Sequence, residues 1–385
     1  MQQSELIARA AALAPLVREH AERTESERDV PPEVFRELVD AGFFRILRPA
    51  RYGGFQMNPE DLFDVVVAAA SGCGSTAWVL TLVAFHPWFA GLLGEEGQKE
   101  VLSDGTDFLA PVVFAPLGKA TRVDGGYRVT GQWAFCTGCT HANWVGVVAT
   151  IKDEEGRKIL VMPRRAECTV LDTWHSTGLR GTGSHDVRLD DVFVPDRRIL
   201  DFQAIAAGQT PGGKLHDTYL YRMPSQAIIS LIGCAPAFAI ARGAIDEFES
   251  RARTRSYMYG TLGEQKNQVG SQMRLARAHA AYDACEALLR AGFGRLRETS
   301  ESGEARREMV RGRIRMQGAY IVNTLYDAVA SLFTASGASA LTERSPIQRA
   351  YRNISAMATH HAFAYDGVAE QYGRLRLGLD PDGLI

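Results

Sequence analysis

The chain has 385 residues, which is long enough for two or three packed units around a large core. Its 43 Lys and Arg residues against 45 Asp and Glu residues give a formal net charge of -2. This composition has no basic excess for nucleic acid or anionic lipid. No export signal is visible and no apolar run approaches the length of a membrane span. We therefore expect a soluble, cytoplasmic protein without nucleic-acid or membrane partners.

The first part of the chain, residues 1–107, is expected to be an N-terminal helical domain. The pair Pro31-Pro32 and the pair Asn58-Pro59 indicate helix starts, and Ser75 is expected to cap an apolar segment that runs to Trp88. That segment is apolar on nearly all sides, which predicts a buried helix. The N-terminal apolar residues follow the spacing of a helix face: Leu6, Ala10, Leu13, Val17 and Ala21.

Residues 108–215 change to the two-residue period of β-strands. Turns at Asp124-Gly-Gly126 and Glu155-Gly156 predict two hairpins. We expect a small, mostly antiparallel β-barrel or sandwich domain here. Residues 216–385 return to helical spacing in four long segments with short connections, which predicts a C-terminal four-helix bundle. The protein is therefore expected to be mainly α, with a central β domain.

The Gly-rich stretch Gly178-Leu-Arg-Gly-Thr-Gly-Ser-His-Asp186 is the most unusual segment. A loop that binds a nucleotide phosphate is followed by a helix whose N-terminal amides hold the anion. This stretch is followed instead by an alternating, strand-like segment that ends at Pro195. Its glycines are therefore expected to bring the backbone close to a flat ligand.

The six cysteines lack the spacing of a disulfide framework and are expected to be reduced. Cys136 and Cys139 form a Cys-x-x-Cys pair, a pattern shared by redox dithiols and half zinc sites. No second Cys or His pair has a matching spacing, and the pair is expected at the end of a strand. We therefore expect no metal.

Four segments occur together in the order found in one superfamily. They resemble the acyl-CoA dehydrogenase superfamily, whose fold is an N-terminal helical domain, a small β domain and a C-terminal four-helix bundle. Residues 135–144 together with the Gly-rich stretch resemble, within it, the group D flavin monooxygenases, the oxygenase components of two-component hydroxylases. The resemblance extends from about Ala41 to Asp380. Besides the Gly-rich stretch, the segments are Phe43-Phe-Arg-Ile-Leu-Arg-Pro-Ala-Arg-Tyr-Gly-Gly54, Trp133-Ala-Phe-Cys-Thr-Gly138 and Pro346-Ile-Gln-Arg-Ala-Tyr-Arg-Asn353.

The resemblance implies an activity. Reduced flavin, FMNH2 or FADH2, would react with O2 to a C4a-(hydro)peroxyflavin that hydroxylates an aromatic or other apolar small molecule. A separate NAD(P)H:flavin reductase is implied as partner, and the chain has no strand-Gly-x-Gly-x-x-Gly-helix unit of its own for NADH. A homotetramer is implied as well. The substrate, the choice of FMN or FAD, and C- or N-hydroxylation stay open.

The resemblance also implies the flavin-binding residues. Thr137 is expected to hydrogen-bond near flavin N5, because a hydroxyl both donates and accepts; its alternative is an ordinary strand threonine. Trp133 and Phe135, two apart, are expected to share a strand face and line the ring system. Arg253 and Arg255, followed by Gly260, match a phosphate-binding arginine that often comes from a neighbouring subunit. The full set is Trp133, Phe135, Cys136, Thr137, Gly138, Gly181, Thr182, Gly183, Ser184, Arg253 and Arg255.

The C-terminal segment distinguishes two activities. By the resemblance, the catalytic Glu of common acyl-CoA dehydrogenases would fall at His361, and no carboxylate lies between Arg352 and Asp366. The monooxygenases carry a His at the position of His360. Its near-neutral pKa suits proton transfer from a phenol, indole or amine, or a hydrogen bond to a flavin peroxide. The alternatives are a core histidine, an atypical dehydrogenase with its base elsewhere, and a degenerate ligand-binding protein.

Further histidines and tryptophans could contact a substrate. The resemblance suggests His86, and we include Trp88 beside it; a helix cap at the break made by Pro87 is the alternative for His86. His141 and Trp144 also fit the pattern, or simply close a strand end. The candidate substrate-binding residues are thus His86, Trp88 and His360.

Overall fold

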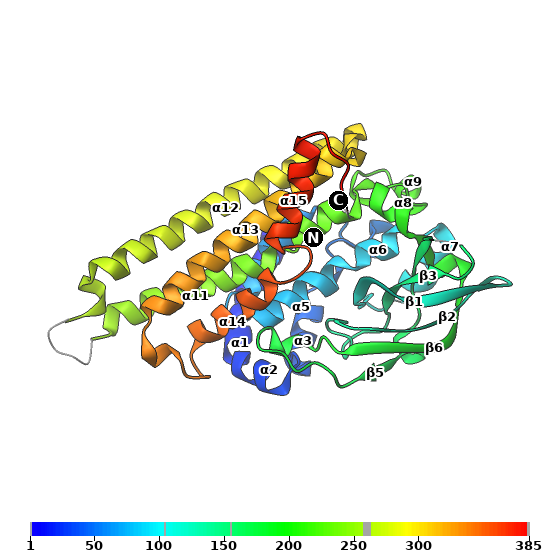
Figure 1. Ribbon diagram of the computed structural model, residues 1–385. Helices are drawn as coiled ribbons and strands as arrows, with labels where there is room; N and C mark the ends of the chain where they lie inside the picture. Colours follow the sequence, from blue (N-terminus) through cyan, green and yellow to red (C-terminus); the bar gives the residue numbers. More distant parts are fainter. Residues whose placement is uncertain (1, 104, 155, 257–262, 383–385) are drawn as a thin grey trace.

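The computed structural model describes residues 2–103, 105–154, 156–256 and 263–382 (Figure 1). A seven-stranded sheet lies at one end, a bundle of long helices extends from the other, and the N-terminal helices lie between them (Figure 1). This arrangement is the expected mainly α architecture with a central β domain. The domain boundaries at 107/108 and 215/216 stay predictions.

The N-terminal helices bury the face that their spacing predicts. Leu6, Ala10, Val17 and Ala21 are almost fully buried, because they recur on the side of the first two helices that faces the core. Leu13 is only partly buried. The helices of this region are α1 (Gln3–Glu19), α2 (Ala21–Glu27), α3 (Pro32–Asp40), α4 (Pro59–Ala70), α5 (Gly74–Phe85), α6 (Pro87–Leu92) and α7 (Glu95–Leu102).

Helix α5 is the buried helix that the sequence predicts, but its start is different. It begins at Gly74 with Cys73 at the N-cap position, so the prediction that Ser75 is the cap is wrong. Ser75 lies in the first turn, and its hydroxyl accepts the backbone N–H of Gly181 at 3.2 Å. This hydrogen bond therefore joins the N-terminal end of α5 to the Gly-rich stretch.

Two helical stretches, Gly74–Leu92 and Ser225–Thr254, are long and apolar enough to cross a membrane by length and composition. The prediction that no run approaches this length is therefore wrong. Their most apolar windows are 94% and 83% buried inside the protein, respectively. Both stretches are core helices of this fold.

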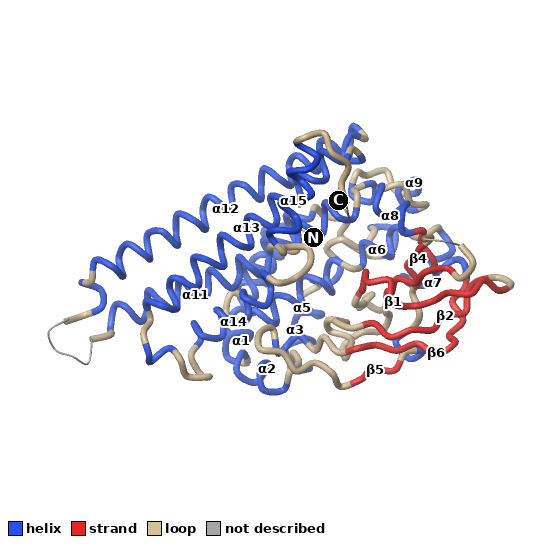
Figure 2. The backbone as a smooth tube through the Cα atoms, in the orientation of Figure 1, coloured by secondary structure: helices blue, strands red, loops and turns tan. Residues whose placement is uncertain are grey.

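The strands form one mixed sheet in the order β5-β6-β2-β1-β3-β4-β7 (Figure 2). Both predicted hairpins are confirmed, because β1 pairs with β2 and β3 with β4 in antiparallel register; β1 and β3 are parallel. Residues from one face of five strands form a single apolar cluster, so the sheet encloses its own core. No second sheet is found among the described residues, as a sandwich would require. The strands are β1 (Val112–Val123), β2 (Gly126–Trp133), β3 (Gly146–Ile151), β4 (Lys158–Val161), β5 (Thr169–Leu171), β6 (Asp186–Pro195) and β7 (Ile199–Asp201).

The C-terminal bundle is built on the long helices α11, α12 and α13, which lie lengthwise beside one another, with α14 packed against α11 and α13 (Figure 1). Its apolar face lines the same core as the N-terminal helices. The last helix, α15, follows α14 after a short turn. The helices are α8 (Phe202–Ala207), α9 (Gly212–Leu215), α10 (Ser225–Ile232), α11 (Ala235–Thr254), α12 (Val269–Ser302), α13 (Glu308–Ala335), α14 (Pro346–Ala358) and α15 (Tyr365–Arg376).

Replacing Gly118 or Gly294 by Ala should change the free energy of unfolding in opposite directions. A Cβ at Gly118 would lie 2.1 Å from the Trp133 ring, so Gly118→Ala should lower the free energy of unfolding by about 2 kcal/mol or more. A Cβ at Gly294, inside α12, meets nothing within 4 Å, so Gly294→Ala should raise it by roughly 0.5–1 kcal/mol. Urea denaturation measures both. Equal midpoints for the two variants would contradict the packing around Trp133.

Candidate functional site

Thr137 lies in the turn after β2, and its hydroxyl belongs to a buried chain of hydrogen bonds. Trp78 Nε1 donates to Thr137 Oγ1 at 3.2 Å. Thr137 Oγ1 lies 2.8 Å from Ser184 Oγ, which lies 2.7 Å from Thr182 Oγ1. Thr182 donates to the carbonyl oxygen of Leu179 at 2.9 Å. The chain thus joins α5 to the turn after β2 and to the Gly-rich stretch.

The direction of this chain follows from the hydrogen count. Each hydroxyl has one hydrogen and two acceptor lone pairs. Because Thr182 uses its hydrogen on Leu179, Ser184 must donate to Thr182, and Thr137 must donate to Ser184. Thr137 also accepts from Trp78. Among the described contacts, one acceptor lone pair of Thr137 is left for a ligand.

Main-chain hydrogen bonds hold the Thr137 turn in place. The N–H of Cys136 donates to the His185 oxygen and that of Gly138 to the Thr182 oxygen, both at 3.0 Å. Gly138 has a left-handed backbone with φ +69°, which glycine adopts without strain. The two segments that supply the hydroxyls are therefore one unit.

His360 lies on another side of Trp78, in the turn after α14. The centroids of the two rings are 5.4 Å apart, edge to face. Burial, with a smaller effect of His361, lowers the pKa of His360 to about 3, so the ring is neutral at pH 7. The N–H of Ala362 donates to Nδ1 at 3.3 Å, which assigns the ring hydrogen to Nε2. His360 is thus a neutral donor.

Trp78 is the residue that sequence reasoning left out of the site. It lies within the apolar segment that the sequence predicts as a buried helix, and a Trp in such a helix has the pattern of a core residue. In the structure it contacts both predicted catalytic residues, Thr137 and His360. Spacing within one helix carries no signal for such a contact between three distant segments.

The glycines of the Gly-rich stretch allow close packing against neighbouring backbone. A Cβ at Gly178 would lie 2.0 Å from the Arg352 oxygen, and one at Gly181 would lie 2.4 Å from the Thr24 oxygen. These two glycines let the stretch pack against α14 and α2, and the approach of its backbone to a flat ligand stays a prediction. Gly183 has φ +53°, and a Cβ there would meet the Asp29 carboxylate. Their packing places the hydroxyls of the neighbouring residues.

Trp133 and Phe135 do not share a strand face, so that prediction is wrong. Strand β2 ends at Trp133, whose ring is fully buried and whose Nε1 donates to the Val148 oxygen at 2.8 Å. Phe135 has φ +64° and is 70% exposed, with its ring near that of Trp174. The left-handed residue turns the chain out of the strand. Phe135 is placed beside the Thr137 turn, whereas Trp133 is in the core of the sheet.

Arg253 and Arg255 lie at the end of α11, across the molecule from the sheet (Figure 1). Arg253 is 75% exposed and pairs with Glu249 at 3.3 Å. Arg255 donates to the Ser336 oxygen and lies 3.5 Å from Gln265 Oε1. The structure does not bring these arginines to the Thr137 turn of the same chain. Gly260 lies outside the described residues.

His86 and Trp88 are buried in the core of the N-terminal helices. His86 Nδ1 donates to the Ala110 oxygen at 2.6 Å, and Trp88 Nε1 donates to the Leu220 oxygen at 2.8 Å. Burial lowers the pKa of His86 to about 4. His86 stands at the junction of α5 and α6, where its N–H caps α5 through Leu82. Its backbone thus has the capping role expected as the alternative.

His141 and Trp144 make protein contacts at the strand ends. The His141 ring stacks on Phe35 with centroids 4.2 Å apart, and its Nε2 lies 3.2 Å from Asp29 Oδ1. Trp144 lies beneath the guanidinium groups of two arginines, 164 and 198. These contacts fit the alternative that both residues close the strand end.

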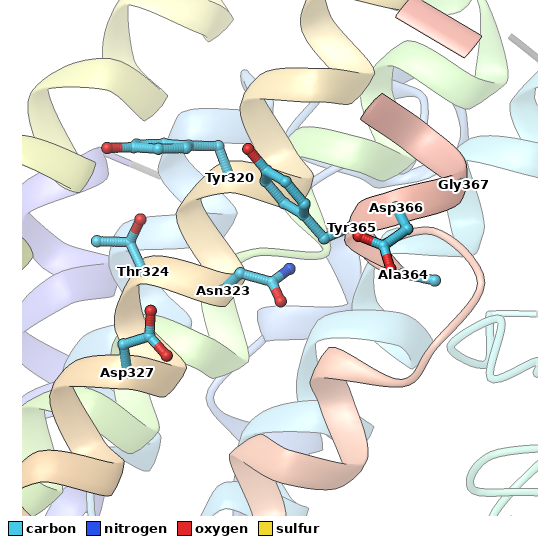
Figure 3. Close-up of a pocket in the computed structure, with 8 residues that line it drawn as sticks. All are labelled: Tyr320, Asn323, Thr324, Asp327, Ala364, Tyr365, Asp366 and Gly367. Atoms are coloured by element: carbon cyan, nitrogen blue, oxygen red, sulfur yellow. The ribbon is translucent and has the colours of Figure 1, made fainter. Parts of the chain in front are cut away.

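A cavity of about 620 Å³ lies between α13 and the start of α15 (Figure 3). Asn323 lines it and donates to the Phe363 oxygen at 2.9 Å, so the cavity adjoins the turn that carries His360. Figure 3 shows two tyrosines and two aspartates around it. Its lining residues are Tyr320, Asn323, Thr324, Asp327, Ala364, Tyr365, Asp366 and Gly367.

Family models match both helical parts of the chain. The acyl-CoA dehydrogenase N-terminal domain matches residues 3–103, and the acyl-CoA dehydrogenase C-terminal domain matches residues 231–365.

Similar proteins cover nearly the whole chain. The oxygenase subunit HsaA of a flavin-dependent monooxygenase from Rhodococcus jostii is 33% identical, over 96% of this chain and 97% of that protein. The oxygenase component of an FADH(2)-dependent resorcinol hydroxylase from Rhizobium sp. is 34% identical, over 98% of this chain and 95% of that protein. The crystal structure of XiaF from Streptomyces sp., in complex with FADH2 and glycerol, superimposes with a TM-score of 0.91 at 26% identity, covering 99% and 97% of the two chains.

The lowered pKa of His86 leads to a prediction of how stability depends on pH. Its pKa is about 4 in the folded protein and near 6.5 when unfolded, so the unfolded chain binds more protons between these values. Stability should therefore fall as the pH drops from 6.5 to about 4, by about 3 kcal/mol from this group. Replacing His86 by Gln keeps a donor for Ala110 and should flatten the loss, measured by urea unfolding across this range. The matched control is His175→Gln, whose side chain is 67% exposed. Parallel pH curves for wild type and His86→Gln would refute the assignment.

Proposed function

Because this chain belongs to the acyl-CoA dehydrogenase superfamily, and within it to the oxygenase components of flavin-dependent monooxygenases, we propose that it hydroxylates a phenolic substrate at Trp78, Thr137 and His360. It uses reduced flavin and O2, and it depends on a separate NAD(P)H:flavin reductase. The enzyme is a homotetramer of the cytoplasm. The contact of Trp78 with both other residues carries the proposal.

The hydroxyl chain fits a reduced flavin. The remaining lone pair of Thr137 accepts a hydrogen bond, and N5 of a reduced flavin carries an N–H, whereas N5 of an oxidised flavin carries none. Thr137 has already committed its own hydrogen to Ser184. The turn is therefore built to favour the reduced cofactor. When bound, the reduced flavin supplies the electrons and the site at which dioxygen is activated.

His360 holds the oxygen atom of the substrate. As a neutral ring with its hydrogen on Nε2, it donates to a phenol or phenolate oxygen without carrying a charge into the site. A donor aimed at developing negative charge in a water-poor site lowers the barrier of a reaction more than it would in water. The edge of Trp78 limits the positions that the His360 ring adopts. One relative is a resorcinol hydroxylase, which supports a phenolic substrate.

Buried apolar groups around Trp78 keep water out. Helix α5 is buried on nearly all sides, and the His360 turn closes on Phe363, whose ring lies 5.9 Å from that of His360. Exclusion of water strengthens the hydrogen bonds of Thr137 and His360 and suppresses side reactions of oxygen.

A second subunit supplies the cofactor phosphate site. Arg253 is 75% exposed at the end of α11, far from the Thr137 turn of its own chain (Figure 1). A guanidinium binds phosphate oxygens in a bidentate manner. We assign Arg253 and Arg255 to the flavin phosphate of a neighbouring subunit, which makes assembly a condition of cofactor binding.

Substitutions of Thr137 and Ser184 test the direction of the hydrogen bonds in the hydroxyl chain. Thr137→Val removes one hydrogen bond and should raise the Kd of reduced flavin about tenfold, with a smaller effect on oxidised flavin. Ser184→Ala releases the Thr137 hydrogen, which then donates to N5 of oxidised flavin, so the preference for reduced flavin should narrow. Anaerobic titration and equilibrium dialysis measure the two affinities. Thr140→Val is the control on the same loop, because Thr140 donates to Asp29. Equal losses for both redox states in Thr137→Val would refute this direction.

Substitutions of His360 test its role in the hydroxylation. His360→Leu removes the donor and should slow hydroxylation of a phenol roughly a hundredfold, whereas His360→Gln keeps an N–H donor and should restore part of the rate. Because the pKa of His360 is about 3, its protonation should add no acidic limb to the rate between pH 5 and 8. Incorporation of oxygen-18 from labelled O2, with an added flavin reductase, measures the product.

The matched control for these variants is the neighbouring His361→Gln. An acidic limb near pH 6.5 that His360→Gln abolishes would contradict the neutral donor. Absence of labelled product from any phenol, together with bleaching of bound oxidised flavin by an acyl-CoA, would contradict the monooxygenase function.

A further inference from the structure

Three buried thiols lie in the core of the sheet beneath the Thr137 turn. Cys136, Cys139 and Cys168 belong to the same apolar cluster, and all are free. The hydroxylation uses none of them. Cys136 and Cys139 flank Thr137 and Gly138, so any covalent change of this pair acts on the residue that binds the flavin.

The backbone of the pair already has the shape that a disulfide requires. The N–H of Cys139 donates to the Cys136 oxygen at 3.2 Å, which closes residues 136–139 into a β-turn. The first and last Cα atoms of a β-turn lie within about 7 Å, and the Cα atoms of a disulfide lie about 4.4–6.8 Å apart. Both side chains are buried in the same apolar cluster, and the Cys139 Sγ donates to the Gly183 oxygen at 3.5 Å. The turn thus places the two cysteines within the Cα range of a disulfide.

The surroundings make the two thiols unequal. The hydrogen bond from Cys136 and the charge of Arg165 hold the pKa of Cys139 below its usual value, although burial opposes them. Burial raises the pKa of Cys136. Arg165 is fixed beside the turn because its Nε donates to the Cys139 oxygen at 2.9 Å. Cys139 is therefore the better nucleophile, and Cys136 is the resolving thiol.

A metal site is the other use of such a pair. In the described part of the chain, no group of three or more His, Cys, Asp or Glu side chains is arranged to hold a metal ion. The geometry instead favours dithiol chemistry.

We propose that Cys136 and Cys139 are a peroxide-responsive thiol pair, which hydrogen peroxide converts to a disulfide across the Thr137 turn. The Cys139 thiolate attacks one peroxide oxygen, the O–O bond breaks, and a sulfenic acid and hydroxide form. The Cys136 thiol then attacks the sulfenic sulfur and expels water. In total, two thiols and one peroxide give one disulfide and two waters. Both side chains are fully buried, so the pair selects small oxidants.

The disulfide acts on the flavin-binding turn. The two sulfur atoms must approach to about 2.05 Å when the bond forms, and this draws in both ends of the turn. Thr137 is fixed from outside by Trp78 and Ser184, so the contraction strains those hydrogen bonds. Reduced flavin should then bind more weakly. This consequence rests on the proposed role of Thr137, whereas formation of the disulfide does not.

Peptide mapping of the wild-type protein tests the bond directly. The protein is treated with hydrogen peroxide, alkylated with iodoacetamide and digested with trypsin. Residues 129–152 form one tryptic peptide that contains both cysteines. After oxidation it should escape alkylation and weigh two hydrogen atoms less than its reduced form, while Cys234 and Cys285 are alkylated. Full alkylation of residues 129–152, or their linkage to the peptide of Cys168, overturns the proposal.

Cysteine variants test whether the disulfide weakens the binding of reduced flavin. Peroxide should weaken binding of reduced flavin several-fold in wild type, and dithiothreitol should restore it. Cys139→Ser should resist peroxide, whereas Cys234→Ser, a control outside the sheet core, should respond as wild type. Cys136→Ala replaces Cys139→Ser if the latter fails to fold. An equal loss of binding in wild type and Cys139→Ser overturns the consequence. Failure of the untreated protein to bind reduced flavin contradicts the proposed function and not the thiol chemistry.

Discussion

The hydrogen bond from Trp78 Nε1 to Thr137 Oγ1 is the contact on which the site depends. It joins a buried helix of the N-terminal region to the turn at the end of β2. The ring of Trp78 also contacts that of His360, which comes from the C-terminal bundle. A buried indole N–H must find an acceptor, because leaving it unpaired costs free energy. The packing of three regions therefore places a hydroxyl and a neutral imidazole against the same tryptophan.

The Gly-rich stretch serves this contact indirectly. Its glycines pack so closely against the backbones of α2 and α14 that no side chain would fit. This packing places the hydroxyls of Ser184 and Thr182 next to Thr137. The result is a chain of donors with one direction, which ends at a backbone carbonyl. Such a chain gives Thr137 a fixed hydrogen-bonding polarity. A threonine on an open strand would instead turn its hydroxyl towards either redox form of a flavin.

The site also shows why one fold serves two activities. The position that the resemblance gives to a dehydrogenase carboxylate is occupied by His361, and its neighbour His360 is kept neutral by burial. A site without a carboxylate base is poorly suited to remove a proton next to a thioester. A neutral donor near a reduced flavin suits oxygen transfer to an electron-rich ring. The two cysteines that flank the Thr137 turn add the proposed response to hydrogen peroxide, which forms when reduced flavin reacts with oxygen without a substrate.

Local sequence determined much of this protein. The apolar spacing around Leu6, the turn at Asp124-Gly-Gly126 and the buried segment around Trp78 each predicted an element that the structure contains, because helix and hairpin periods are local properties. The ordered segments identified the superfamily, and they are the basis of the roles predicted for Thr137 and His360. Only the tertiary structure decided that Trp78 connects them, that Trp133 is in the core and that Phe135 turns away from its strand. These contacts join residues far apart in the sequence or depend on one left-handed backbone angle, so no local period contains them.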